Sequence, residues 1–163
     1  MGWGLSSAAR LCTRPSYYEE CDLPFYFFVQ SNLNGFVLDI RGGSKDPGTP
    51  IISFPKNGAA GTPNQLWTFT SDGFIESKLN GFVLDIRGSS KDPGTPIISF
   101  PKNGAAGTPN QKWKLGTGGL IVSELNGFVI DIQGSNTNPS TPIISFPKNG
   151  AAGTPNQLWK CTW

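Results

Sequence analysis

Four residue types that could bind a polar ligand recur along the chain at a spacing of 46 residues. They are Asp39, Asp85 and Asp131; Asn64, Asn110 and Asn156; Gln65, Gln111 and Gln157; and Phe54, Phe100 and Phe146. A carboxylate accepts strong hydrogen bonds from hydroxyl groups, and an amide both donates and accepts them. An aromatic ring offers an apolar face. An acid, an amide and an aromatic ring around one shallow cleft are the groups needed to bind a sugar ring.

Each of these residues also has a structural alternative. Aspartate is depleted in strands, so Asp39 either accepts sugar hydroxyls or ties down a glycine-rich loop by accepting backbone N–H bonds. Asn64 either binds a hydroxyl or forms a turn, and the two roles are compatible. Gln65 is interpreted mainly as a strut that buries its amide between loop backbones. Phe54 faces outward if Ile51 faces the core, and it belongs to the core if this parity is reversed.

The spacing reflects an internal repeat, because residues 33–67 return almost unchanged at 79–113 and more loosely at 125–159. The first two copies differ only at Gly43 against Ser89 and at Leu66 against Lys112. The third copy keeps the aspartate, phenylalanine, asparagine and glutamine. It replaces Arg41 and Arg87 with Gln133, and its loop carries the uncharged residues Thr137 and Asn138. We therefore expect two nearly interchangeable sites and a third with altered affinity or preference.

Each repeat reads as four short strands with no helical period. In the first repeat we expect strands at 28–31, 36–40, 50–54 and 65–69, with a hairpin at Asn34-Gly35. Twelve strands in three equal units predict an all-β fold, the β-trefoil, rather than a propeller, which needs more blades. Trp67, Trp113 and Trp159 are expected to gather in the core.

The predicted organisation is an N-terminal extension of unknown role at 1–26 and a trefoil domain at 27–163. We number its repeats 1 (about 27–72), 2 (73–118) and 3 (119–163). A formal charge of +2 gives no basic stripe for nucleic acid, and the chain has no histidine for His-dependent catalysis or His-bearing zinc sites. No signal peptide or membrane-spanning segment is recognised, so the sequence predicts no insertion into a membrane and leaves localisation open.

The cysteines leave two alternatives open. Cys12 and Cys21 lie in the extension, and Cys161 occupies the position of Phe69 and Leu115 in the other repeats. Cys161 is either a small buried apolar residue or the partner of Cys12 or Cys21 in a disulfide.

Three segments of repeat 1 resemble the ricin B-chain-type (R-type) β-trefoil lectins. They are Val37-Leu38-Asp39-Ile40, Thr49-Pro50-Ile51-Ile52-Ser53-Phe54 and Asn64-Gln65-Leu66-Trp67. The Gly-Ser-x-x-x-Gly-Thr-Pro-Ile stretch is similar to fungal members, and the resemblance covers about residues 27–163. It implies that the family's sugar-binding Asp, stacking aromatic residue, hydroxyl-binding Asn and Gln fall on the four repeated positions given above.

The resemblance further implies a metal-free, cofactor-free lectin that binds glycans or glycoconjugates, with galactose or N-acetylgalactosamine as the first candidates. Phe stands where the family more often has Trp or Tyr, and Ile52 replaces a frequently polar residue. We therefore expect either weak single sites or a shifted set of contacts, and weak sites would gain apparent affinity through multivalency. An oligomer remains open.

Three other functions remain as alternatives. The trefoil could serve as an interaction or inhibitor scaffold, although its near-identical loops argue against this. It could be the targeting module of a larger toxin or hydrolase. A glycosidase needs two carboxylates across one sugar, and repeat 3 has lost the second candidate, Asp46, to Asn138. We therefore expect no enzymatic activity.

Overall fold

The computed structural model describes residues 25–163, so nearly all of the predicted extension lies outside the described residues. The described part contains twelve β-strands and short 3-10 segments. The strands are β1 (Phe28–Ser31), β2 (Val37–Ile40), β3 (Thr49–Phe54), β4 (Trp67–Phe69), β5 (Ile75–Ser77), β6 (Val83–Ile86), β7 (Thr95–Phe100), β8 (Trp113–Leu115), β9 (Ile121–Ser123), β10 (Val129–Ile132), β11 (Thr141–Phe146) and β12 (Trp159–Thr162). The 3-10 segments are η2 (Arg41–Gly43), η3 (Pro63–Gln65), η4 (Arg87–Ser89), η5 (Pro109–Gln111), η6 (Thr117–Gly119), η7 (Gln133–Ser135) and η8 (Pro155–Gln157).

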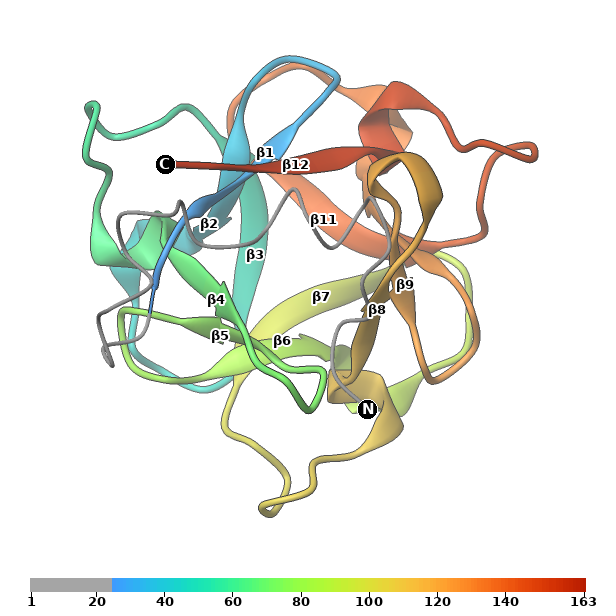
Figure 1. The fold of residues 1–163 in the computed structure, drawn as a ribbon, viewed down its shortest axis with the longest axis horizontal. Coiled ribbons are helices and arrows are strands. Elements are labelled where there is room, and N and C mark those ends of the chain that lie inside the picture. The colour runs from blue at the N-terminus through green and yellow to red at the C-terminus, as the bar shows by residue number, and fades with distance from the viewer. Residues whose placement is uncertain (1–24) are drawn as a thin grey trace.

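The strands form the predicted β-trefoil. Within each repeat the second and third strands pair as antiparallel hairpins, which are β2–β3, β6–β7 and β10–β11. The last strand of each repeat pairs with the first strand of the next repeat, as β4–β5 and β8–β9, and β12 returns to β1. Figure 1 shows the resulting pseudo-threefold arrangement, with β3, β7 and β11 meeting around its centre.

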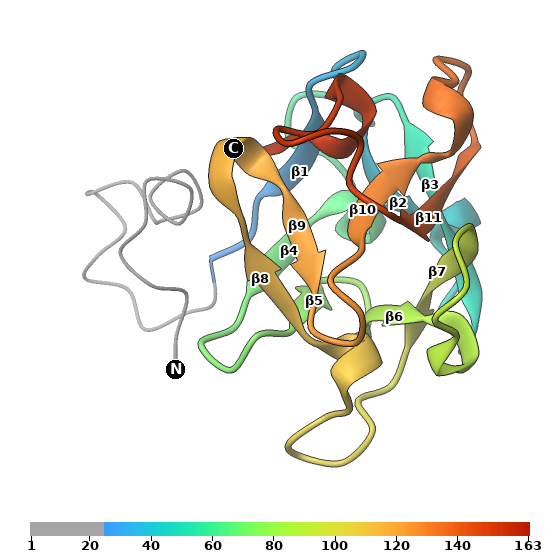
Figure 2. The same ribbon diagram turned by 90° about the vertical axis from the view of Figure 1, so that its right-hand side faces the viewer.

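The two kinds of strand pair occupy different ends of the molecule. In Figure 2, β4–β5 and β8–β9 lie toward one end, and β3, β7 and β11 lie toward the other. The strands β3, β7 and β11 pair with one another in all three combinations. Each repeat is therefore hydrogen-bonded to both of the others, which closes the sheet and removes most of its free edges.

The core contains the three repeated tryptophans, as predicted. Trp67, Trp113 and Trp159 are buried, and they belong to one apolar cluster with the second-strand and third-strand residues Leu38, Ile40 and Ile51 and their counterparts. The indole Nε1 of each Trp donates to a second-strand carbonyl at 3.0–3.1 Å. Phe69 and Leu115 pack against this cluster, and Cys161 is part of it.

The Asn-Gly hairpins also form where they were predicted. Gly35 has a φ of 77°, and Oδ1 of Asn34 accepts a hydrogen bond from the backbone N–H of Phe36 at 3.0 Å. Glycine is favoured here because a positive φ costs it little.

One predicted strand boundary is wrong. The fourth strand begins at Trp67 and not at Gln65, because Pro63, Asn64 and Gln65 form the 3-10 segment η3. Proline at the first position of such a turn has its φ already set, and it gives up an N–H that would have no partner there. The same turn forms at η5 and η8.

Cys161 is disulfide-bonded, and its partner lies outside the described residues. The residue is also buried in the core cluster, so the two roles considered for it coexist. Within residues 25–163, no helix is long and apolar enough to span a membrane.

Candidate functional site

The Asp39 carboxylate is buried and held by two side-chain amides. Asp39 is 3 % exposed on β2. Nε2 of Gln65 donates to its Oδ2 at 2.8 Å, and Nδ2 of Asn64 donates to its Oδ1 at 3.2 Å. Among the described residues, the hydrogen-bond donors to this carboxylate are these side chains, and not backbone N–H groups of the glycine-rich loop. The loop-anchor alternative for Asp39 has no such bond to support it.

Gln65 forms the predicted strut. Its side chain is fully buried, and Nε2 donates to the Pro55 carbonyl at 2.8 Å as well as to Asp39. Its Oε1 accepts from the backbone N–H of Asn57 at 2.8 Å. A single amide thus joins the carboxylate to the loop that follows β3, and the same bonds recur for Gln111 and Gln157.

Both polar atoms of the Asn64 side chain are hydrogen-bonded. Nδ2 donates to the Ile40 carbonyl at 3.1 Å, and Oδ1 accepts from Oγ1 of Thr62 at 2.6 Å. Nδ2 of Asn57 in turn donates to Oγ1 of Thr62 at 2.9 Å. Because both hydrogens of Asn64 Nδ2 point at protein acceptors, its 3.2 Å bond to Asp39 is the weakest and the most easily exchanged. The turn-forming role considered for Asn64 is realised in η3.

Burial raises the pKa of Asp39, Asp85 and Asp131 above the ordinary value for aspartate. The hydrogen bonds from the neighbouring Gln and Asn side chains oppose this by stabilising the charged form. Desolvation is the larger effect at all three positions. Each repeat therefore holds a carboxylate that is poorly solvated and gains from further hydrogen-bond donors.

A cleft of about 350 Å³ opens beside Asp39. It is lined by Asp39, Arg41, Gly42, Gly43, Ile52, Phe54, Asn57, Thr62, Asn64 and Ser140. This volume lies within the range of roughly 300–1,000 Å³ that is usual for small-molecule sites. Phe54 and Ile52 face the cleft, whereas Ile51 is in the core cluster. The open question of parity is therefore settled, and the Phe54 ring is presented to the cleft.

We call the groups around the three aspartates sites 1, 2 and 3, one in each repeat. Site 1 combines Asp39, Phe54, Asn64 and Gln65; site 2 combines Asp85, Phe100, Asn110 and Gln111; and site 3 combines Asp131, Phe146, Asn156 and Gln157. The hydrogen bonds described for Gln65 repeat within 0.1 Å in the other two sites.

The loop that carries Asn57 and Thr62 packs against an aromatic ring. Gly61 has a φ of +69°, and a Cβ placed on it would lie 2.5 Å from the Phe28 ring. Nζ of Lys56 lies 4.5 Å from the centre of the same ring. This close packing fixes the loop that carries Asn57 and Thr62.

Several residues of the cleft are not among the predicted site residues. Asn57 and Thr62 recur at the same 46-residue spacing, as Asn103 and Asn149 and as Thr108 and Thr154, so the repeat itself could have identified them. Arg41 was noted only as a difference between repeats. Ser140 had no recognisable signal, because it belongs to a different repeat.

The cleft lining contains a single carboxylate, that of Asp39. Within residues 25–163, no three His, Cys, Asp or Glu side chains are grouped as a metal site would need. The site as described offers hydrogen-bond acceptors and donors, one cation and an aromatic face.

A family model described as the Ricin-type beta-trefoil lectin domain matches residues 25–159. The C-terminal half of an earthworm R-type lectin, solved in complex with GalNAc, is 31% identical with a TM-score of 0.66. That match covers 85% of this chain and 98% of the lectin chain. No curated protein sequence matches the chain.

Two further solved structures are similar. The designed threefold-symmetric protein ThreeFoil has a TM-score of 0.72 at 24% identity, covering 85% of this chain and 98% of its own. The exo-β-1,3-galactanase 1,3Gal43A from Clostridium thermocellum has a TM-score of 0.74 at 28% identity. This match covers 87% of the present chain but only 30% of the galactanase.

Proposed function

Because the chain belongs to the family of ricin-type β-trefoil lectin domains, we propose that it is a multivalent, metal-independent binder of glycans that carry galactose or N-acetylgalactosamine. The observation that carries this proposal is the buried Asp39 carboxylate, which lines a cleft together with Phe54. A pyranose has hydroxyl groups on its edge and an apolar face, and the cleft offers a partner for each.

The carboxylate acts as the acceptor for sugar hydroxyls. An ionised carboxylate has about four acceptor positions, and Gln65 and Asn64 occupy two of those of Asp39. The remaining positions can accept two adjacent hydroxyls. Such charge-assisted bonds are stronger than those between neutral groups. A bound sugar also takes the place of water next to a poorly solvated charge.

The amides act as the donors. A sugar hydroxyl can replace the 3.2 Å bond between Asn64 and Asp39 by accepting from Asn64 and donating to the carboxylate. Asn57 is exposed at the rim and uses one Nδ2 hydrogen for Thr62, so the other hydrogen is directed to solvent or ligand. Gln65 does not need to touch the sugar, because its bonds to Asp39, Pro55 and Asn57 fix the position of the carboxylate.

The sugar proposed is supported by the earthworm R-type lectin half, which was solved in complex with GalNAc. Multivalency is supported by the near-identity of the three hydrogen-bond networks. Three weak sites on one rigid body gain apparent affinity for clustered glycans when the spacing allows them to bind together.

A glycan array probed with the intact protein tests this function, and we expect signals concentrated on galactose- and GalNAc-terminated glycans. The triple variant Asp39→Ala/Asp85→Ala/Asp131→Ala should lose these signals. The matched control is Asp46→Ala/Asp92→Ala, which removes exposed aspartates of the adjacent loops that have no part in the carboxylate network. A silent array at high protein density, or unchanged binding by a folded triple variant, would overturn the proposal.

A second candidate function is favoured by the galactanase, most of whose chain lies outside the matched region. In this role the trefoil would hold an attached catalytic domain on its polysaccharide. Binding to long galactans but not to short galactose-terminated glycans on the same array would favour it over the first proposal.

A further inference from the structure

One residue that lines site 1 comes from another repeat. Ser140 follows η7 in repeat 3, yet it borders the cleft together with Asp39 and Phe54. Its backbone N–H donates to the carbonyl of Ser53 at 2.8 Å, and Ser53 immediately precedes Phe54. The contact continues into the pairing of β11 with β3, in which Thr141 lies opposite Ser53. Site 1 is thus assembled from repeats 1 and 3.

Equivalent backbone hydrogen bonds join each of the other two sites to a different repeat. The backbone N–H of Gly48 donates to Ser99 at 2.8 Å, and that of Gly94 donates to Ser145 at 2.8 Å. Ser99 and Ser145 immediately precede the aromatic residues of sites 2 and 3. Repeat 1 therefore borders site 2, repeat 2 borders site 3, and repeat 3 borders site 1.

The bordering residue is glycine at sites 2 and 3 but serine at site 1. Gly48 and Gly94 both have a φ of +85°, and Ser140 has a φ of 67°. A left-handed conformation costs a residue other than glycine about 1–2 kcal/mol. Repeat 3 therefore retains a strained serine at a position where its two counterparts use the residue that fits best. Strain of this kind is concentrated at binding and active sites.

The position leaves room for a side chain that reaches a ligand. A Cβ placed on Gly48 or Gly94 would meet no atom within 4 Å. Ser140 itself is exposed, and within residues 25–163 its hydroxyl has no hydrogen-bond partner. It is therefore a free donor and acceptor at the rim of the cleft.

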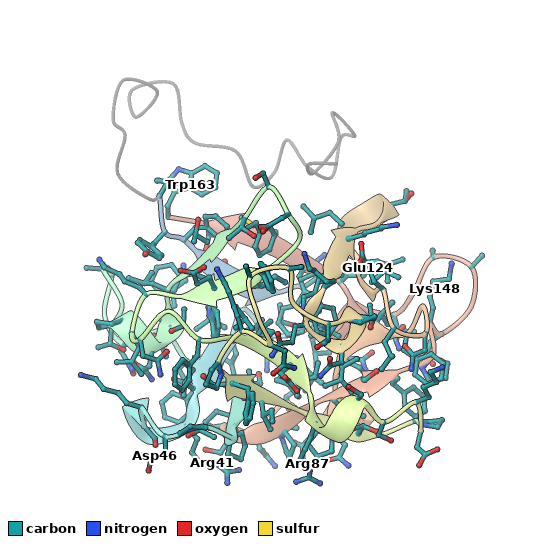
Figure 3. All side chains as sticks on the ribbon, turned by 90° about the horizontal axis from the view of Figure 1, so that it is seen from below. Arg41, Asp46, Arg87, Glu124, Lys148 and Trp163 are labelled. Atoms are coloured by element: carbon teal, nitrogen blue, oxygen red, sulfur yellow. The ribbon has the colours of Figure 1, made fainter. Side chains whose placement is uncertain are left out.

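The residue that borders each site from its own repeat varies independently. Arg41 lines site 1, and Arg87 and Gln133 hold the equivalent positions in the other repeats. Figure 3 shows Arg41 and Arg87 projecting from the end of the molecule opposite Trp163. Site 1 thus has arginine and the serine of another repeat, whereas sites 2 and 3 have glycine in place of that serine and carry Ser89 and Ser135 where site 1 has Gly43.

We propose that Ser140 is a specificity-determining residue of site 1, whose hydroxyl bonds a polar substituent of the bound sugar that sites 2 and 3 leave to water. Sites 1 and 2 then differ at Ser140 against Gly48, in addition to the difference of Gly43 against Ser89 within the repeats that carry their aspartates. This inference rests on the proposed sugar-binding function.

Proteins with a single intact site test it. Asp85→Ala/Asp131→Ala leaves site 1, and Asp39→Ala/Asp131→Ala leaves site 2. Ser140→Ala is added to each protein, and galactose and N-acetylgalactosamine are titrated calorimetrically. We expect Ser140→Ala to weaken binding about threefold to tenfold at site 1, the usual effect of one neutral hydrogen bond. Site 2 should be unaffected.

Two further variants separate the hydroxyl from the backbone. Ser140→Gly removes the strain together with the hydroxyl, and it should weaken site 1 as Ser140→Ala does. Gly48→Ser places a hydroxyl beside site 2, and it should strengthen binding there but not at site 1. The inference is overturned if Ser140→Ala leaves site 1 unchanged, or if it affects both sites equally. If neither parent single-site protein binds sugar, the proposed function itself fails, and the inference fails with it.

Discussion

Nε2 of Gln65 lies 2.8 Å from Oδ2 of Asp39, although 26 residues separate them in the sequence. Gln111 and Asp85, and Gln157 and Asp131, are joined at the same distance. Two residues after each glutamine comes the tryptophan that fills the core. In the repeated Gln-x-Trp motif, the tryptophan thus belongs to the core and the glutamine to the candidate site.

Replacing Gln65 with alanine should be more destabilising than replacing Asp39 with alanine. Gln65→Ala leaves the Asp39 carboxylate, the Pro55 carbonyl and the Asn57 N–H without their partner, and we expect a loss of about 2–4 kcal/mol in the free energy of unfolding. Asp39→Ala removes a charge that is itself costly to bury, so we expect a loss of about 1 kcal/mol. Urea denaturation of both variants measures the difference.

The exposed substitution Ser71→Ala serves as the control and should leave the free energy of unfolding within about 0.5 kcal/mol of the parent. Equal losses for Gln65→Ala and Asp39→Ala would show that the glutamine does not hold the network together.

Sugar binding should be lost on acidification at a higher pH than an exposed aspartate would allow. Burial raises the pKa of Asp39, Asp85 and Asp131, and a protonated carboxyl accepts hydroxyl hydrogen bonds poorly. Calorimetric titration with galactose between pH 3 and pH 7 should show affinity rising through the raised pKa. A binding curve that stays flat down to the ordinary pKa of aspartate, about 3.9, would contradict this prediction.

The contribution of these three aspartates to the free energy of unfolding should fall as the pH rises, whereas sugar affinity rises. Because the folded pKa of each of the three aspartates lies above the unfolded value, the folded state holds more protons between the two. The stability contributed by these groups is fully present below the unfolded pKa and is lost as the pH rises through the folded pKa. Urea denaturation across this interval should therefore show the three groups contributing less at the higher pH.

The triple variant Asp39→Asn/Asp85→Asn/Asp131→Asn isolates this effect, because it keeps an acceptor for each glutamine but cannot titrate. The difference in free energy of unfolding between parent and variant should change across the interval. A constant difference would mean that the aspartates titrate alike in the folded and unfolded states.

Removing the indole of one repeated tryptophan tests its dual role. Trp113→Phe fills most of the space but leaves the Leu84 carbonyl without the donor that lies 3.1 Å away. We expect a loss of about 1–3 kcal/mol in the free energy of unfolding. Trp113→Ala should cost about 3–5 kcal/mol, because it also creates a cavity. Guanidinium denaturation followed by circular dichroism measures both losses. A negligible loss for Trp113→Phe would show that the hydrogen bond to Leu84 contributes little.

Two glycines in one loop provide a matched test of packing. Gly61 and Gly58 both have a positive φ, of 69° and 74°. A Cβ on Gly61 would meet the Phe28 ring at 2.5 Å, whereas a Cβ on Gly58 would meet nothing within 4 Å. Gly58→Ala should therefore cost about 1 kcal/mol from backbone strain alone.

Gly61→Ala should cost at least about twice as much and should weaken sugar binding at site 1, because the loop with Asn57 and Thr62 must move. Gly153→Ala should fall between the two, since its Cβ would meet the end of the more flexible Leu120 side chain at 2.9 Å. Thermal unfolding ranks the three variants, and equal shifts for Gly58→Ala and Gly61→Ala would contradict the proposed support by Phe28.

Much of the strand arrangement and of the core could be predicted from the repeated sequence pattern. It identified the strands to within one residue at β1, β2 and β3, and it identified the tryptophan core, because alternation and turn residues are local signals. The boundary at Gln65 was wrong because a Gln-Leu-Trp run looks extended. The preceding Pro63 was the local signal for a turn.

The orientation of Phe54 could not be predicted from its own repeat. Ile51, Ile52 and Phe54 are all apolar, so alternation alone does not say which face is the core. The contribution of Ser140 to site 1 could not be predicted either, because it depends on how β11 and β3 pair once the three repeats close. Interactions within a repeat can be inferred from the sequence pattern, but those between repeats follow only from the closed fold.

The cyclic contacts from Ser140, Gly48 and Gly94 bear on how small such a protein could be. A peptide of one repeat would contain most of one site and the rim of another, but no complete site. It could form the complete site proposed for this chain only if three copies assembled around an axis, each completing the next, in a closed ring with cyclic symmetry. For a one-repeat form of this chain, ligand affinity would therefore depend on peptide concentration.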